Sequence, residues 1–351
     1  MTVRKHADRQ TRNFWNVRKD TGFAVYTNGE RGNRAVNLIE VNHLKKYFNT
    51  AGGILHAVDD VSLSIPSSKT MGVVGESGCG KSTLGRTIIR LLQPTAGEVL
   101  FKGENITSLS SREFKKMRAG MQMIFQDPYA SLDPRMSVFQ LIAEPIVTYK
   151  LAADKRELES RVKELMDTVG LAQRLKGSYP HELDGGRRQR IGIARALSLN
   201  PEFIVCDEPV SALDVSIQAQ VLNLLQDLQK EKNLTYMFIT HDMSVVKHIS
   251  DEICVMYLGQ IVERCEAKEL FANPLHPYSQ ALLSAIPVPN IHLKKQKIAM
   301  KGELTSPIDP KPCCRFAPRC PCASQECFAA EPEGTYCENG HYVLCHKAAG
   351  A

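Results

Sequence analysis

The sequence lacks any apolar run long enough to cross a lipid bilayer. No run of about 18 consecutive apolar residues occurs in it. The first 40 residues are polar and basic, without the apolar segment that a secretory signal peptide needs. The sequence therefore predicts a chain that neither spans a membrane nor is secreted.

Strong charge of one sign is also lacking. The formal net charge is +6, which is too small to indicate a dedicated nucleic-acid-binding protein, although it suits phosphates or an anionic membrane surface. Apolar residues make up 43% of the chain, which excludes wholesale disorder. The length of 351 residues predicts two or three structural units.

Cysteine is the residue whose distribution is informative. Of 11 cysteines, 7 lie between Cys313 and Cys345. Without a signal peptide, this usage indicates a reducing, intracellular compartment and a special role for the C-terminal cysteines.

The chain divides by composition into three parts. Residues 1–36 form a polar extension, and a Pro-rich, basic stretch at 287–312 reads as a linker. Between them, short apolar runs at 73–74, 121–125, 203–206, 236–239 and 253–258 alternate with helical patterns at 158–169 and 221–228. This alternation predicts an α/β domain around a largely parallel sheet.

A glycine-rich loop indicates a site for nucleotide phosphates. It follows a strand-like run, precedes a helical pattern and fits G-x-x-x-x-G-K-[ST] with Gly75, Glu76, Ser77, Gly78, Cys79, Gly80, Lys81, Ser82 and Thr83. Glycines let successive backbone N–H groups turn toward phosphate oxygens, and the following helix adds its positive N-terminus. We expect Lys81 to neutralise the β- and γ-phosphates of ATP, and Ser82 to supply a hydroxyl to Mg²⁺.

Two adjacent carboxylates support the nucleotide interpretation. Asp207 and Glu208 end the apolar run 203–206, and strand ends in a parallel sheet line the ligand crevice. Asp207 is expected to hold Mg²⁺ through water, and Glu208 to polarise the attacking water as general base.

Five further motifs, in the right order, make residues 37–290 resemble the ATP-binding subunit of an ABC transporter. Gln126 matches the Q-loop glutamine, which touches Mg²⁺ or the attacking water. His241 matches the switch histidine, which contacts the γ-phosphate, and Phe48 (or its neighbour Tyr47) matches the aromatic that stacks on adenine. The other two motifs are the signature, Asp184, Gly185, Gly186 and Arg187, and the D-loop, Ser211, Ala212, Leu213 and Asp214.

The resemblance implies a fold and an assembly. The fold is a P-loop NTPase (RecA-like) core with an antiparallel β-subdomain near 37–70, a helical subdomain near 135–198 and a small Cys-rich C-terminal extension at 291–351. Two ATPase subunits would meet head to tail, because phosphate loop and signature come from opposite chains. They would drive two transmembrane permease subunits from the cytoplasmic face of the cell membrane, as peripheral subunits.

The signature departs from the family pattern Ser-Gly-Gly-Gln at Asp184 and Arg187. A carboxylate about 4 Å from a phosphate charge is repelled by about 4 kcal/mol at an effective dielectric constant of 20. Each composite site combines the phosphate loop of one subunit with the signature of the other, and we expect the site that uses this signature to be weak. Arg187 could offset the negative charge by pairing with Asp184 or by reaching the phosphate itself. The alternative is that Asp184 is tolerated and both sites are active. A weak site favours a paralogous partner subunit over an identical copy.

The segments 127–135 and 276–285 resemble those of peptide-type importers, and so does a C-terminal motif made of residues 302–307, 314–321, 327 and 340–345. In that family the permease's coupling helix docks near the Q-loop, and an extracytoplasmic solute-binding protein delivers the substrate. The implied substrates are di- or oligopeptides, with nickel complexes, glutathione, opines or sugars as alternatives.

Four cysteines occupy positions of the C-terminal motif, namely Cys314, Cys320, Cys327 and Cys345. Four thiolates close in sequence can ligate zinc or an iron–sulfur cluster. The resemblance favours a 4Fe-4S cluster, and structural Zn²⁺ or free or disulfide-linked thiols are the alternatives.

Two other classes of protein fit the sequence less well. A soluble ABC ATPase of translation or DNA repair would join two such domains or insert a long coiled coil, whereas this chain has one phosphate loop and no sustained heptads. A regulatory module would have a broken ATPase site, but Lys81, Asp207, Glu208 and His241 are all present. No nucleic-acid partner is expected.

Overall fold

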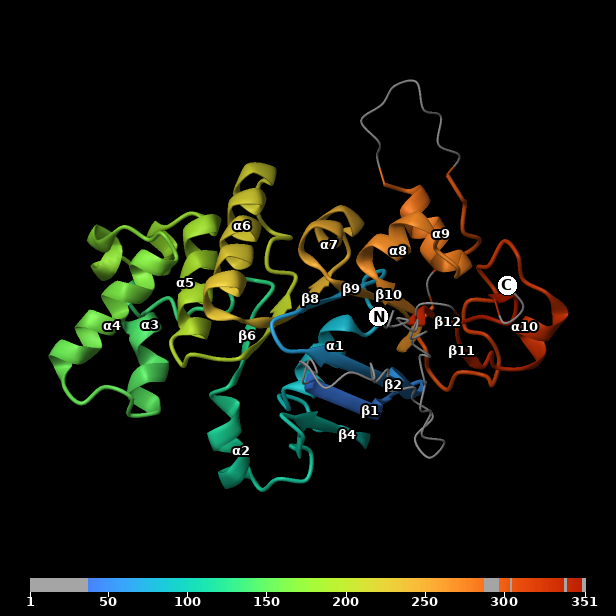
Figure 1. Cartoon of the computed structure of the whole chain (residues 1–351), viewed down its shortest axis with the longest axis horizontal. Coiled ribbons are helices and arrows are strands. Elements are labelled where there is room, and N and C mark those ends of the chain that lie inside the picture. The colour runs from blue at the N-terminus through green and yellow to red at the C-terminus, as the bar shows by residue number, and fades with distance from the viewer. Residues whose placement is uncertain (1–36, 287–296, 304, 338–339, 349–351) are drawn as a thin grey trace, which may run out of the picture. The chain divides into compact units, whose positions relative to one another are not determined.

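A computed structural model describes residues 37–286, 297–303, 305–337 and 340–348 (Figure 1). The predicted polar extension at 1–36 and the start of the predicted linker lie outside these described residues. Within them, the strands form a four-stranded sheet and an eight-stranded sheet.

The four-stranded sheet is antiparallel, with the order β2-β1-β4-β5. β1 (Asn37–Thr50) and β2 (Gly53–Pro66) form a hairpin within the predicted antiparallel β-subdomain, and β4 (Ala96–Phe101) and β5 (Glu104–Asn105) extend it from a later part of the chain. β4 was not predicted. It belongs to the sheet because Val99 and Phe101 alternate onto the apolar face that β1 and β2 also bury.

The eight-stranded sheet has the order β11-β12-β10-β9-β3-β8-β7-β6. Its five neighbouring parallel strands are β9 (Glu252–Tyr257), β3 (Thr70–Val74), β8 (Thr235–Thr240), β7 (Phe203–Asp207) and β6 (Met121–Ile124). These strands are almost wholly buried, as expected for a parallel sheet with both faces covered. The predicted strands and the largely parallel sheet are confirmed.

Helices pack around this sheet. α1 (Lys81–Ile88) follows β3, α6 (Val215–Lys232) follows β7 and α7 (Met243–Ile249) follows β8, while α2 (Ser111–Arg118) precedes β6. In Figure 1, α3 (Val138–Thr148), α4 (Lys155–Thr168) and α5 (Gly185–Leu197) group together at the β6 end of the sheet. Their apolar faces share one core with α6, through Val138, Val162, Ile191 and Val221.

Two strands of the C-terminal region extend the main sheet. After α8 (Ala267–Ala272), α9 (Pro277–Ser284) and α10 (Gln325–Ala329), the strands β11 (Gly334–Tyr336) and β12 (Tyr342–Leu344) pair with each other. β12 pairs antiparallel with β10 (Gln260–Glu266), which places Val343 opposite Glu263.

A buried carboxylate explains this attachment. Glu263 has no exposed surface, and its two oxygens accept the backbone N–H groups of Leu275 and His276 at 2.6 and 3.1 Å. His341 Nε2 lies 2.7 Å from Glu263 Oε1. A buried carboxylate is stable only when its oxygens have hydrogen-bond partners, so the C-terminal region is tied to β10. Among the described residues, no helix has both the length and the apolar character needed to span a bilayer.

Candidate nucleotide site

The parallel strands bring the predicted site residues to one edge of the sheet. The phosphate loop follows β3, Gln126 follows β6, Asp207 ends β7 and His241 follows β8. Because the carboxyl ends of parallel strands meet at the same edge, the phosphate loop, Gln126 and His241 line one cavity of about 690 Å³ together with Glu208. Asp207 is fully buried and is not part of the lining. Its lining includes Phe48, Gly75, Glu76, Ser77, Gly78, Gly80, Lys81, Ser82, Thr83, Gln126, Glu208 and His241.

The phosphate loop wraps around the Lys81 side chain. Lys81 is only 4% exposed, and its Nζ donates to the carbonyl oxygens of Gly75 and Glu76 at 2.8 and 2.9 Å. Gly80 has φ +106°, and a Cβ there would lie 2.0 Å from the carbonyl oxygen of Ala57. Only glycine fits this turn. The Cys79 side chain within the loop is buried, and burial raises the pKa of its thiol.

The predicted Mg²⁺ ligands lie directly against each other. Ser82 Oγ donates to Asp207 Oδ1 at 2.6 Å. Asp207 has no exposed surface, and Arg86 Nη2 donates to its Oδ2 at 3.2 Å. A hydroxyl beside a carboxylate is a pair of oxygen donors of the kind that Mg²⁺ prefers. Sequence reasoning missed Arg86, although it lies one helical turn after Ser82 on α1, where side chains share a face.

Glu208, Gln126 and His241 form one hydrogen-bonded group. Gln126 Nε2 donates to Glu208 Oε2 at 3.0 Å, and His241 Nδ1 lies 3.2 Å from Glu208 Oε1. Glu208 has φ +45°, a left-handed conformation that is strained for a residue with a Cβ, and its N–H donates to the carbonyl of Ile239 at 2.9 Å. A carboxylate at this edge of the cavity can accept a proton from an attacking water.

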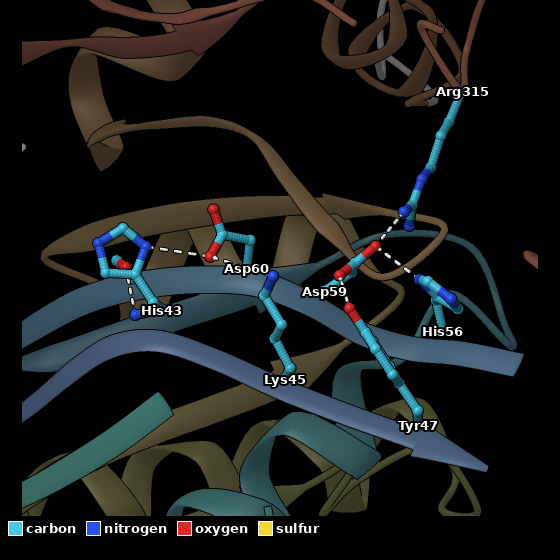
Figure 2. A network of polar contacts seen from close by, with 8 residues as sticks. His43, Lys45, Tyr47, His56, Asp59, Asp60 and Arg315 are labelled. Carbon is cyan, nitrogen blue, oxygen red and sulfur yellow. Dashed lines mark hydrogen bonds and ion pairs between the residues drawn. The ribbon is translucent and has the colours of Figure 1, made fainter. Parts of the chain in front are cut away.

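Of the two aromatic candidates for adenine, the structure places Phe48 in the cavity. The neighbouring Tyr47 is engaged elsewhere, because its hydroxyl donates to Asp59 and its ring stacks on His56 at 4.0 Å between centroids (Figure 2).

The signature and the D-loop pack against each other, outside the cavity lining. A Cβ on Gly186 would lie 2.7 Å from Ile217 Cγ2, and one on Gly185 would lie 3.1 Å from Leu213 Cδ2. The signature glycines therefore allow α5 to approach the D-loop and the start of α6. Ser211 Oγ in turn donates to the carbonyl of Glu208 at 3.1 Å, which connects the D-loop to the end of β7.

Asp184 and Arg187 pair within the signature. Asp184 caps α5 by accepting the N–H of Arg187 on Oδ1 at 2.8 Å, and Arg187 Nε lies 3.3 Å from Oδ2. Arg187 was expected to offset the Asp184 charge either by pairing with it or by reaching the phosphate, and in the structure it pairs with Asp184. Both oxygens of Asp184 are thus engaged at the end of the helix that would otherwise attract an anion.

Comparison with known proteins decides the family. A family model for the ABC transporter matches residues 58–211, and one for the oligopeptide/dipeptide transporter C-terminal region matches residues 262–327. The oligopeptide transport ATP-binding proteins OppF and AppF of Bacillus subtilis are 58% and 52% identical to the chain, over 89% and 88% of it and 97% of each relative. The chain belongs to the ABC transporter ATP-binding family.

Solved structures agree with this assignment. The ATP-binding cassette MJ0796, in a dimeric post-hydrolysis state bound to ADP and phosphate, is 28% identical. It matches with a TM-score of 0.61 over 65% of this chain and 98% of that one. The predicted P-loop NTPase fold and the resemblance to this family are confirmed, and the chain is an ABC ATPase that uses ATP and Mg²⁺.

The C-terminal cysteines of this ABC ATPase form no disulfide in the structure. All eleven cysteines lie in the described residues, and none forms a disulfide. The Cys314 N–H donates to the carbonyl of Cys327 at 3.0 Å, and burial raises the pKa of Cys314 to about 11, with Cys327 and Cys345 adding to the effect. Among the described residues, no group of three or more His, Cys, Asp or Glu side chains is arranged to hold a metal ion.

Three residues outside the family's nucleotide motifs contact this site or the hairpin beside it, and sequence reasoning missed all three roles. Tyr278 Oη accepts the N–H of Glu76 at 2.9 Å, and Arg319 pairs with the Glu76 carboxylate. Arg315 donates to Asp59, which also accepts from Tyr47 (Figure 2). The sequence feature that could have indicated these contacts is a pair of positive charges, Arg315 and Arg319, in the short segment between Cys314 and Cys320.

Proposed function

We propose that this ABC ATPase powers the uptake of di- or oligopeptides. The observation that carries the proposal is the joint match to the ABC transporter model and to the oligopeptide/dipeptide transporter C-terminal region. Relatives named as oligopeptide transport ATP-binding proteins, including OppF of Escherichia coli at 50% identity, support it. Neither comparison favours nickel complexes, glutathione, opines or sugars as the solute.

Hydrolysis would begin when ATP enters the cavity beside Phe48 and the phosphate loop. Lys81, which now donates to two loop carbonyls, is expected to turn its ammonium group to the phosphates. Ser82 and Asp207 would hold Mg²⁺, which neutralises phosphate charge when bound. Glu208 would accept the proton of the attacking water, with Gln126 and His241 orienting the carboxylate between them.

We also propose a paralogous ATPase subunit as the partner. Val215 follows the D-loop and is 82% exposed, so its apolar side chain is available to a partner at this face. A carboxylate at Asp184, in place of the serine of the family signature, favours a weak composite site at this signature, and an identical partner would repeat that weakness in both sites. The dimeric state of the MJ0796 cassette is consistent with pairing of two cassettes.

The permease subunits are proposed to dock on the helical side of the Q-loop. Tyr129 and Tyr179 are 56% and 41% exposed. Arg188 connects the two, because its guanidinium lies 4.8 Å from the Tyr129 ring centroid and its Nε donates to the carbonyl of Pro180 at 2.6 Å. Exposed aromatic rings beside an arginine are typical of protein interfaces. This docking would place the subunit on the cytoplasmic face, served by an extracytoplasmic solute-binding protein.

A 4Fe-4S cluster, or alternatively Zn²⁺, on Cys314, Cys320, Cys327 and Cys345 remains a proposal. Burial raises the pKa of Cys320, and the nearby Cys322, Cys345 and Cys327 thiols add to the effect, which supports proximity of these groups. The described thiols do not themselves form a ligand set. Iron, sulfide and zinc analysis of anaerobically purified chain tests the proposal, and metal-free, colourless chain would contradict it.

The test of transport is a deletion strain that takes up peptides through this chain. Deletion is expected to abolish growth on an oligopeptide as sole source of a required amino acid, and the wild-type chain to restore it. The Glu208→Gln chain should fail to restore growth while still co-purifying with two membrane permeases. Normal peptide growth with loss of uptake of another solute would contradict the assignment.

A further inference from the structure

The phosphate loop is anchored at Glu76 from three directions. Its N–H donates to Tyr278 Oη of α9 at 2.9 Å, and its carbonyl oxygen accepts from Lys81 Nζ at 2.9 Å. Its carboxylate pairs with both terminal nitrogens of Arg319, at 2.5 Å for Nη1–Oε2 and 3.0 Å for Nη2–Oε1. Because Lys81 holds the same residue, a shift of Glu76 would also shift the lysine that binds phosphates.

Arg319 is fixed in a packed aromatic setting. Its side chain is 9% exposed, and its guanidinium lies 5.9 Å from the ring centroid of Tyr257. Phe316 packs edge-on against Tyr257 at 5.1 Å and tilted against Tyr278 at 5.4 Å. A bidentate arginine that packing has already ordered loses little conformational freedom when it pairs with a carboxylate.

The Glu76–Arg319 ion pair affects the charge that a bound phosphate meets, because Glu76 lines the nucleotide cavity. An unpaired carboxylate in the loop that cradles phosphates repels them, and the repulsion grows as water is excluded. Arg319 cancels this charge and draws the carboxylate toward the C-terminal region, while the backbone of Glu76 stays at the cavity.

The same region reaches the hairpin side of the cavity. Pro307, which lines the cavity, accepts the N–H of His56 at 2.9 Å, and Asp309 N–H donates to the carbonyl of Ile54 at 2.9 Å. Figure 2 shows Arg315 extending to Asp59, which is held also by His56 and Tyr47. The C-terminal region therefore contacts both the phosphate loop and the hairpin that carries Phe48.

We propose that Arg319 is a positioning residue of the phosphate loop, through which the C-terminal region sets the affinity of this chain for ATP. Arg319 acts through Glu76, by neutralising its carboxylate and drawing it toward the C-terminal region. The inference depends on the proposed function only in that the cavity binds ATP.

The experiment measures the affinity of the full-length chain for a fluorescent ATP analogue. Arg319→Gln is expected to bind about tenfold more weakly, equivalent to about 1.4 kcal/mol. The double variant Glu76→Gln/Arg319→Gln is expected to return to within about twofold of wild type, because the unpaired carboxylate is gone. Lys311→Gln, which removes an exposed positive charge from the same region, is the matched control and should bind as wild type.

Two results would overturn the proposal. One is wild-type affinity in Arg319→Gln, and the other is a double variant as weak as Arg319→Gln alone. Should thermal unfolding without nucleotide show that Arg319→Gln does not fold, Arg319→Lys decides. Lysine keeps the positive charge but cannot pair with both oxygens of Glu76, so ATP binding is expected to weaken about threefold. Unchanged affinity in Arg319→Lys would overturn the proposal.

The Lys81→Ala variant shows whether a negative result concerns the role of Arg319 or the assignment of the nucleotide site itself. Its affinity should fall strongly if the cavity binds the phosphates of ATP. Undiminished binding by Lys81→Ala would mean that the nucleotide site lies elsewhere, whatever Arg319→Gln does. A loss in Lys81→Ala without one in Arg319→Gln would leave the site in place and reject the positioning role.

Discussion

Replacing His276 by asparagine should make the free energy of unfolding less dependent on pH, by the contribution of one titrating group. His276 is 1% exposed, and its Nδ1 accepts the N–H of Tyr278 at 3.0 Å at the start of α9. Burial lowers its pKa to about 4, and the nearby Glu263 opposes the shift only in part. Asparagine keeps an acceptor at this capping position but cannot be protonated in the range of interest.

The sign follows from the two protonation states. An unfolded histidine titrates near pH 6.5, so between about pH 6.5 and 4 the unfolded chain holds a proton that the folded chain does not. The stability contributed by neutral, buried His276 is complete above pH 6.5 and is lost as the pH falls toward 4. The free energy of unfolding falls by about 1.36 kcal/mol per pH unit in this range. Between pH 7.5 and 5.5 the loss from His276 should be about 1.3 kcal/mol.

Urea unfolding followed by circular dichroism at the two pH values measures this difference. The asparagine variant should be less stable than wild type at pH 7.5, because the imidazole packs 5.6 Å from the Phe316 ring centroid. At pH 5.5 the gap in unfolding free energy should narrow by about 1.3 kcal/mol. An unchanged gap would refute the reasoning. The result bears on function, because His276 caps the helix whose Tyr278 holds the phosphate loop.

Three further variants test the site and its surfaces. Glu208→Gln should lower hydrolysis by about 10²- to 10⁴-fold with ATP binding retained; phosphate release and nucleotide binding measure this, and normal turnover would contradict it. Asp184→Ser keeps a cap on α5 but removes a repulsion of about 1 to 4 kcal/mol, so ATP-dependent association with the partner subunit, followed by sedimentation, should tighten at least about fivefold. Unchanged association would favour the alternative that Asp184 is tolerated. Tyr129→Glu should reduce co-purification of the permeases at unchanged ATP affinity, and full recovery of the permeases would exclude Tyr129 from the docking surface.

The nucleotide edge of the fold could be predicted from local pattern. Asp207 and Glu208 follow a continuous apolar run, and the phosphate loop lies between a strand and a helix, so each motif carries its own structural context. β4 and the C-terminal strands were not predictable in this way. Their place is decided by partners distant in sequence, such as β1 for β4 and β10 for β12.

The sequence by itself determined which chemistry this protein performs, because nine contiguous residues and a few strand-end side chains suffice to hold a nucleotide. Only the tertiary structure decided that Phe48 rather than Tyr47 faces the cavity, and that Arg187 pairs with Asp184. It also decided that Arg319 lies against Glu76, 243 residues away in sequence. The physical reason is that an ion pair or a buried carboxylate depends on which distant groups packing brings within a few ångströms, and no local pattern records that distance.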